Sequence, residues 1–297
     1  MVWVAGFGVK GLMDRRALLA ALPLLAGCTP SLGTFDMLAP RDGGVRRVAR
    51  DVAYGDGPRR RLDVYAPAER GAASRQVIVF IYGGSWSSGD KDDYEFLGAA
   101  LAAQGFVVVL PDYRLVPQVR FPGFLEDCAA AVGWVSDQVS AYGGDPGRIV
   151  LMGHSAGAYN AIMLALAHDY LRAADVDGRA IRGAAGLAGP YDFLPLDTDA
   201  TRNAFGNAPD LQITQPVHFA RADAPPLLLL WGEDDTTVGS GNLENLARVQ
   251  RAAGGVVDTK TYPGIGHVEI MLALSRPLRG RAPVLDDMTA FARRVTA

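Results

Sequence analysis

The feature that most constrains the fold is a series of short, wholly apolar segments separated by helical stretches. The apolar segments occupy residues 77–81, 106–110, 149–152 and 227–230. A strand that is apolar at every position has both faces covered, which is typical of parallel sheets packed between helices. Helical stretches are expected between these segments, over residues 92–104, 124–141 and 156–169. The alternation of strand and helix therefore predicts an α/β fold with a mostly parallel sheet wrapped by helices.

Further elements on both sides of this region complete the predicted sheet. Residues 48–54 and 61–65 are β-like, and the second segment alternates apolar and polar residues as a half-buried strand does. We expect these two segments to form an antiparallel edge. Additional strands are predicted at 181–187 and 256–262, with closing helices at 242–253 and 283–295. A single domain over residues 45–297 follows from this arrangement.

Residues 190–225 interrupt the alternation. They contain several prolines, Asp and Asn, and only brief apolar pieces. Long irregular segments inside a compact domain usually carry function or local helices. This segment lies between two predicted strands of the sheet, so it should sit near the strand ends. We expect a small cap insertion there that takes part in substrate selection.

The N-terminus has the layout of a signal peptide. Charged residues 14–16 precede an apolar run over 17–26, and the run ends in Leu25-Ala26-Gly27-Cys28. The run is too short to span a bilayer as a stable helix. The tetrad resembles the bacterial lipobox, in which the cysteine becomes the lipid-bearing first residue of the mature protein. We therefore expect a lipoprotein signal peptide over 1–27 and acylation of Cys28. The alternative is a buried N-terminal helix with an ordinary cysteine.

The same N-terminal segment predicts the cellular location of the protein and the tether that joins Cys28 to the domain. Residues 28–44 are expected to act as a flexible tether, since 31–44 is rich in Gly, Pro and small residues. Met13 lies where such signals usually begin, so residues 1–12 are expected to be an upstream extension. Thr29, rather than Asp, follows the cysteine, which favours the outer membrane of a bacterial envelope. A soluble periplasmic or cytoplasmic location remains the alternative.

Composition excludes several kinds of partner and cofactor. The 297 residues carry a formal charge of -3 from 29 basic and 32 acidic side chains, without long runs of either sign. No electrostatic footprint for nucleic acid is present. We expect no metal or organic cofactor, because no residues have the spacing of zinc ligands and the glycine-rich segments lack a P-loop lysine. Cys128, in a helical segment without a nearby histidine, is expected to be a core residue.

Ser155 is the predicted nucleophile. The segment Gly153-His154-Ser155-Ala156-Gly157 follows a predicted strand and opens a predicted helix, which is the context of the G-x-S-x-G motif. A serine on such a turn needs a strained backbone, and the flanking glycines leave room for neighbouring elements. The alternative is a simple helix start, with Ser155 near the N-cap.

A serine hydroxyl needs a base to take its proton, and the chain has 4 histidines. His154 adjoins the nucleophile and must point elsewhere, His168 lies at the far end of the following helix, and His218 lies in the irregular cap. Each of these is expected to be structural or solvated. His267 stands in a glycine-rich loop directly after the last predicted strand, where a side chain can reach across the carboxyl edge of the sheet. We therefore predict His267 as the base.

An acid and an oxyanion hole complete the predicted site. A carboxylate must orient the imidazole, and residues 233–235 supply three adjacent acids after a buried strand. Any one of them could instead be a solvated turn residue. Tyr82-Gly83-Gly84-Ser85-Trp86 follows another buried strand. The backbone N–H groups of Gly83 and Gly84, together with that of Ala156, are expected to bind the oxyanion.

Together these motifs resemble the esterase branch of the α/β hydrolases that carries His-Gly-Gly-Gly, near the hormone-sensitive-lipase and feruloyl-esterase-like (BD-FAE-like) enzymes. The resemblance extends over roughly residues 61–295 and includes further matches at 111–115, 121–122 and 142–149. The variant Gly-Gly-Ser-Trp also resembles prenylcysteine methylesterase-like sequences. The resemblance implies the α/β-hydrolase fold with a small cap.

The resemblance also assigns the acid. In this branch a strand is followed by an aromatic residue or His, then Gly, two residues and Asp, and this pattern places the acid at Asp235. The order Ser155, Asp235, His267 is that of the α/β hydrolases. One departure is Tyr82, which stands where the branch has histidine, so a different hydrogen bond must steady the loop.

The function implied is hydrolysis of small carboxylic esters through an acyl-enzyme. An amidase, formamidase or peptidase on the same triad is the alternative enzyme. A catalytically idle envelope lipoprotein that binds a ligand is the alternative from another class. Contact with a membrane is expected only through the lipid anchor.

Overall fold

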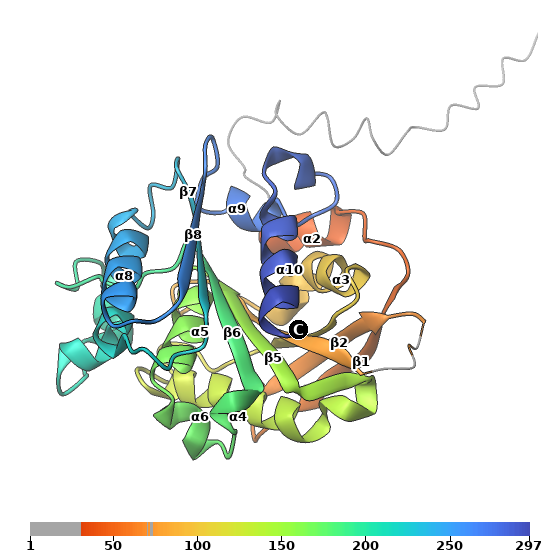
Figure 1. Ribbon diagram of the computed structural model, residues 1–297, viewed down its shortest axis with the longest axis horizontal. Coiled ribbons are helices and arrows are strands. Elements are labelled where there is room, and N and C mark those ends of the chain that lie inside the picture. The colour runs from red at the N-terminus through yellow and green to blue at the C-terminus, as the bar shows by residue number, and fades with distance from the viewer. Residues whose placement is uncertain (1–30, 70, 72–73) are drawn as a thin grey trace, which may run out of the picture.

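An eight-stranded sheet forms the centre of the molecule, in a computed structural model that describes residues 31–69, 71 and 74–297 (Figure 1). The strand order is β1-β2-β4-β3-β5-β6-β7-β8. The pairs β1/β2 and β2/β4 are antiparallel and all other pairs are parallel. The α/β-hydrolase fold and its antiparallel edge are therefore confirmed. The strands are β1 (Val45–Ala53), β2 (Arg61–Pro67), β3 (Arg75–Ile81), β4 (Val107–Pro111), β5 (Gly144–His154), β6 (Ile181–Leu187), β7 (Leu227–Gly232) and β8 (Val257–Tyr262).

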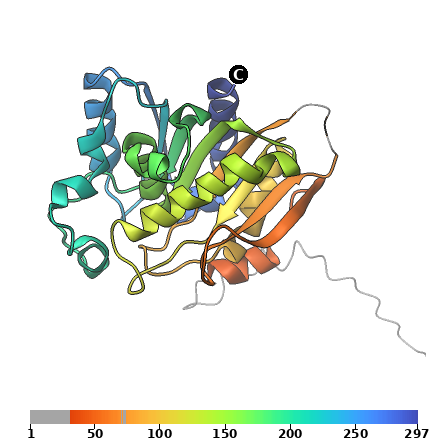
Figure 2. The same ribbon diagram turned by 90° about the horizontal axis from the view of Figure 1, so that it is seen from below.

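Helices cover both faces of this sheet. Figures 1 and 2 show α3 and α10 on one face and α4, α5 and α8 on the other. The inner strands are apolar throughout for this reason: every residue from Val77 to Ile81 is at most 1% exposed. The helices are α2 (Leu32–Leu38), α3 (Glu95–Ala103), α4 (Gly123–Gln138), α5 (Ala156–Leu166), α6 (Asp169–Ala173), α7 (Asp199–Phe205), α8 (Gly241–Ala252), α9 (Glu269–Leu272) and α10 (Val284–Val295).

Three predicted helices differ from the structure at their ends, and the one predicted over 92–104 begins as a 3₁₀ turn, Lys91–Tyr94, before α3. The predicted helix over 156–169 is two helices, because α5 ends at Leu166 and α6 begins at Asp169. The predicted helix over 124–141 ends as α4 at Gln138 and continues as a 3₁₀ turn, Val139–Tyr142, before β5. Gly143, at a φ of 84°, then reverses the chain in the left-handed conformation that glycine adopts most readily.

The expected flexible tether over 28–44 is wrong for the part that the structure describes. Residues Leu32–Leu38 form helix α2, which packs against α3. The ring of Phe35 meets Phe96 edge-on at 5.4 Å, and buried Asp36 accepts a hydrogen bond from the Phe96 N–H at 2.8 Å. These contacts order a segment whose small residues and glycines alone indicate a linker.

The remaining N-terminal predictions lie outside the described residues. They are the signal peptide over 1–27 and the acylated Cys28. Within the part of the chain that the structure describes, no helix has the length and apolar character needed to cross a bilayer.

The segment between β6 and β7 contains short helices in place of long regular elements. Helix α7 lies there, together with two 3₁₀ turns, Leu211–Thr214 and Pro216–Phe219. The ring of Phe205, at the end of α7, contacts the ring of Trp86 edge-on at 4.7 Å. Trp86 follows β3, so the irregular segment packs over the carboxyl edge of the sheet.

Candidate active site

The turn that carries Ser155 is strained. Ser155 has φ 53° and ψ −121°, a left-handed conformation that costs free energy for a residue with a side chain. The two flanking glycines are needed for close packing. A Cβ on Gly157 would lie 2.0 Å from the carbonyl oxygen of Ile81, and one on Gly153 would lie 2.2 Å from the carbonyl oxygen of Gly157. The turn therefore holds the serine at the start of α5, against the end of β3.

The structure brings Ser155, Asp235 and His267 together. The Nε2 atom of His267 lies 2.9 Å from the Oγ atom of Ser155, and its Nδ1 atom lies 2.8 Å from the Oδ2 atom of Asp235. Since a carboxylate only accepts, Nδ1 carries the proton and donates to Asp235. Nε2 is then free to accept the proton of the serine hydroxyl. This is the geometry of a nucleophile, a base and an orienting acid.

The three adjacent acids after β7 have distinct environments. The Asp235 side chain is fully buried, and its Oδ1 atom accepts from the N–H groups of Thr237 at 2.8 Å and Val238 at 2.9 Å. Glu233 and Asp234 are exposed, and Glu233 accepts from a threonine of β8. Two backbone donors lock the Asp235 carboxylate, so that its second oxygen faces the imidazole.

The glycine loop, residues 83–89, follows β3 and lies beside Ser155. A Cβ on Gly83 would be 3.0 Å from the Cβ of Ser155, which shows how closely the two backbones approach. Burial raises the pKa of Tyr94, and the neighbouring backbone N–H of Gly83 opposes this rise. Within the described residues, the N–H groups of Gly84 and Ala156 donate to no protein acceptor. These two groups are therefore available to an oxyanion.

His154 packs against His267, and this contact was not predicted from the sequence. The two rings lie 4.9 Å apart, and the Nε2 atom of His154 donates to the backbone carbonyl of His267 at 2.7 Å. Its Nδ1 atom is buried and has no hydrogen-bond partner within the described residues. Burial, and then the neighbouring imidazole of His267, lower the pKa of His154 to about 3. His154 is therefore neutral at physiological pH and holds the backbone of the predicted base.

The other side chains considered from the sequence lie outside this arrangement. His168 and His218 are exposed. Cys128 is buried, as expected, and burial raises the pKa of its thiol well above the usual value. A thiol in this state is a packing residue and a poor nucleophile.

A carboxylate cluster and a cavity lie elsewhere in the described part of the chain. Asp51, Asp63 and Asp92 lie close enough together to hold a cation. The Nζ atom of Lys91 already lies 2.7, 3.2 and 2.7 Å from these three carboxylates, respectively, and supplies the positive charge.

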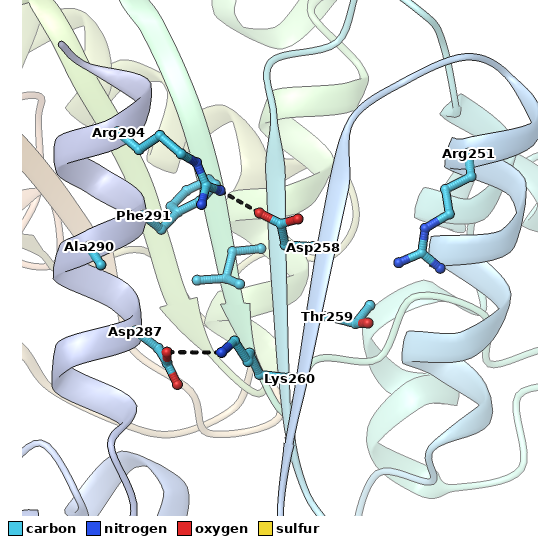
Figure 3. A pocket seen from close by; sticks show the side chains of 9 residues that line it. Arg251, Asp258, Thr259, Lys260, Asp287, Ala290, Phe291 and Arg294 are labelled. Carbon is cyan, nitrogen blue, oxygen red and sulfur yellow. Dashed lines mark hydrogen bonds and ion pairs between the residues drawn. The ribbon is translucent and has the colours of Figure 1, made fainter.

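The cavity of about 540 Å³ lies between α10 and β8. Figure 3 shows Arg294 turned toward Asp258 and Lys260 turned toward Asp287, with 3.3 Å between the Lys260 Nζ atom and the Asp287 carboxylate. None of its lining residues belongs to the Ser155 site.

Comparison with known families adds to this geometry. Residues 62–248, more than half of the chain, match the family model BD-FAE. The chain belongs to the BD-FAE family. This assignment confirms the resemblance to feruloyl-esterase-like sequences that the motifs indicate.

Curated relatives of this BD-FAE protein are esterases by name. The chain is 30% identical over 267 residues to isoprenylcysteine alpha-carbonyl methylesterase ICME of Arabidopsis thaliana, covering 82% of this chain and 62% of the relative. A probable enzyme of the same name from Oryza sativa subsp. japonica is 33% identical, with coverage of 82% and 63%. Esterase LipC of Mycobacterium tuberculosis is 28% identical, with coverage of 73% and 59%. The chain thus spans less than two thirds of the length of these relatives.

Solved structures support the fold of this BD-FAE protein. Esterase B from Lactobacillus rhamnosis has a TM-score of 0.79 and 21% identity, covering 95% of this chain and 96% of that one. Thermogutta terrifontis esterase 2 has a TM-score of 0.69 and 23% identity, covering 86% of this chain and 96% of that one. At this level of identity the likeness concerns the fold alone.

Proposed function

We propose that this BD-FAE protein hydrolyses carboxylic esters, with Ser155 as nucleophile, His267 as general base and acid, and Asp235 as the group that orients the base. The observation that carries the proposal is the continuous hydrogen-bonded path from the Oγ atom of Ser155 to the carboxylate of Asp235, with distances of 2.9 and 2.8 Å. Membership of a family whose curated relatives are named esterases supports the same reaction class.

The chemistry begins with transfer of the hydroxyl proton of Ser155 to Nε2 of His267 while Oγ attacks the ester carbonyl. The imidazolium is stabilised by the buried carboxylate of Asp235. Collapse of the tetrahedral intermediate expels the alcohol, which takes its proton from His267. A water molecule then attacks the acyl-enzyme by the same proton route and releases the acid.

The tetrahedral intermediate needs donors for its oxyanion. Gly83, Gly84 and Ala156 are the groups predicted from the sequence, and the N–H groups of Gly84 and Ala156 donate to no protein acceptor within the described residues. Both groups lie on the elements that meet at Ser155. Loss of one such donor typically costs about 3 to 4 kcal/mol of transition-state stabilisation.

The test compares p-nitrophenyl esters with matched p-nitroanilides, using the wild-type protein and Ser155→Ala. We expect ester turnover in the wild type and a loss of at least about 1,000-fold in the variant. Faster turnover of anilides would favour an amidase or peptidase on the same triad. No turnover of either series, together with retained folding, would favour the ligand-binding lipoprotein.

We infer from the Leu25-Ala26-Gly27-Cys28 tetrad that Cys28 carries the lipid of a bacterial envelope lipoprotein, with the outer membrane favoured by Thr29. Helix α2 begins at Leu32, and the four peptide units from Cys28 to Leu32 span at most about 14 Å. A lipid on Cys28 would therefore hold the domain close to the bilayer surface.

The lipid proposal is tested by labelled-palmitate incorporation and membrane fractionation of the wild type and Cys28→Ala. Label in the wild type alone supports it. An unlabelled wild type in the soluble cytoplasmic fraction rejects it and leaves the esterase proposal unaffected.

A further inference from the structure

The glycine loop adopts a backbone that few sequences tolerate. Left-handed φ angles occur at Gly84 (124°), Ser85 (52°), Trp86 (58°) and Gly89 (107°). Residues with side chains persist in this region only where surrounding contacts over-determine the backbone. The loop must therefore be held from outside, by groups that contact both of its ends.

Arg59, in the turn between β1 and β2, contacts both ends of the loop. Its Nη2 atom donates to the hydroxyl of Tyr82 at 2.5 Å, immediately before the loop, and to the carbonyl of Gly89 at 2.7 Å, at the last residue of the loop. Its Nε atom donates to the carbonyl of Tyr113 at 2.9 Å. A guanidinium is planar and presents its donors in a fixed arrangement, so one side chain can set the distance between the two loop ends.

Tyr82 is itself firmly placed. Its hydroxyl donates to the Oδ1 atom of Asp112 at 2.9 Å, and the same oxygen accepts from the Lys91 N–H at 2.9 Å. Its ring stacks between Tyr113, at 4.8 Å, and Tyr94, at 5.6 Å. Tyr82 stands where the esterase branch has a histidine, so this network supplies the hydrogen bonds that the departure from the motif requires.

We propose that Arg59 is a positioning residue that clamps the glycine loop between Tyr82 and Gly89, and so holds the loop's N–H groups ready for an oxyanion. The inference rests on the proposed ester hydrolysis. Arg59 acts through its two partners and not on the substrate. Because oxyanion donors act on charge that develops in the transition state, loss of the clamp should lower kcat more than it raises KM.

The test uses Arg59→Met, with Arg60→Met as the matched control. Arg60 is the next residue, and its Nε atom donates to Asp127 at 2.8 Å, so the control removes the same charge without touching the loop. For p-nitrophenyl acetate we expect kcat of Arg59→Met to fall about 100-fold with KM changed less than about threefold. Equal changes in both variants would overturn the clamp.

Arg59→Lys separates geometry from charge. Lysine keeps the positive charge but replaces the planar fork by a single nitrogen. The clamp predicts only partial recovery of kcat in this variant. Complete recovery would mean that the charge near Asp112, which lies 3.6 Å from Arg59, is sufficient, and would overturn the geometric role.

Hydrogen exchange provides a readout that does not depend on ester turnover. In Arg59→Met the amides of residues 83–89 should exchange at least about tenfold faster, with exchange in α5 unchanged. This result is expected even if the wild type hydrolyses no ester, so failure of the proposed function and failure of the clamp are distinguishable. Unchanged loop exchange in the folded variant would refute the clamp. If Arg59→Met does not fold, Tyr82→Phe removes the hydroxyl that Arg59 contacts, together with its bond to Asp112, and carries both readouts.

Discussion

His154 should make the protein less stable in mild acid, by an amount that follows from its burial. Its pKa is lowered to about 3 in the folded protein, against about 6.5 in an unfolded chain. Between these two values the unfolded state binds a proton that the folded state excludes, so the free energy of unfolding falls as the pH falls from about 6.5 toward about 3. From pH 7.5 to pH 5.0 the loss from this one group is about 2 kcal/mol.

The assay is urea denaturation at pH 7.5 and pH 5.0 for the wild type and His154→Gln. The glutamine amide can still donate to the carbonyl of His267, but it binds no proton. Other titrating groups contribute equally to both proteins, so the difference between their pH dependences isolates His154. We expect the wild type to lose about 2 kcal/mol more than the variant between the two pH values. Parallel losses would show that His154 is not buried as a neutral imidazole.

Two further substitutions test the site and its framework. Asp235→Asn should lower kcat by about 10⁴-fold, because the amide oxygen stays with the N–H groups of Thr237 and Val238 and the amide NH₂ then faces Nδ1 of His267, which favours the wrong imidazole tautomer. Asp234→Asn should change kcat less than about threefold. Ester turnover measures both effects, and a larger loss at Asp234 would refute the assignment. Gly157→Ala should lower the free energy of unfolding by about 3 kcal/mol in thermal or urea melts, because the new Cβ would lie 2.0 Å from the backbone oxygen of Ile81. Gly280→Ala, with nothing within 4 Å of its Cβ position, is the control, and equal effects at both positions would contradict the packing of the turn.

The parts of the fold that could be predicted are those with a local signal. The inner strands are apolar at every position because both faces are covered, and this pattern is visible in a few residues. Ser155 could be predicted because its strand, turn and helix are contiguous. The 3.6-residue pattern of α10 likewise reflects one buried face, which includes Met288 and Phe291.

The parts that could not be predicted depend on contacts between distant residues. Three adjacent acids look alike in sequence, so the choice of Asp235 depends on the family resemblance, and it is the fold that brings this residue to His267 across 32 positions. The bond from His154 to the backbone of His267 joins residues 113 positions apart. Helix α2 has 7 residues, too few for a periodic pattern, and its order comes from docking on Phe96. Arg59 reaches Gly89 across 30 positions, so no local motif identifies it.

The most direct test of the central claim is the site of covalent labelling by a fluorophosphonate, located by peptide mass spectrometry. This reagent traps an activated serine without requiring knowledge of the natural ester. The account predicts one adduct per chain, on the peptide that contains Ser155, and no adduct in Ser155→Ala or after unfolding in urea. Labelling is also expected to slow by orders of magnitude in His267→Ala, because the hydroxyl then lacks its base. An unlabelled native protein, or an adduct on another residue that persists in Ser155→Ala, would contradict the account.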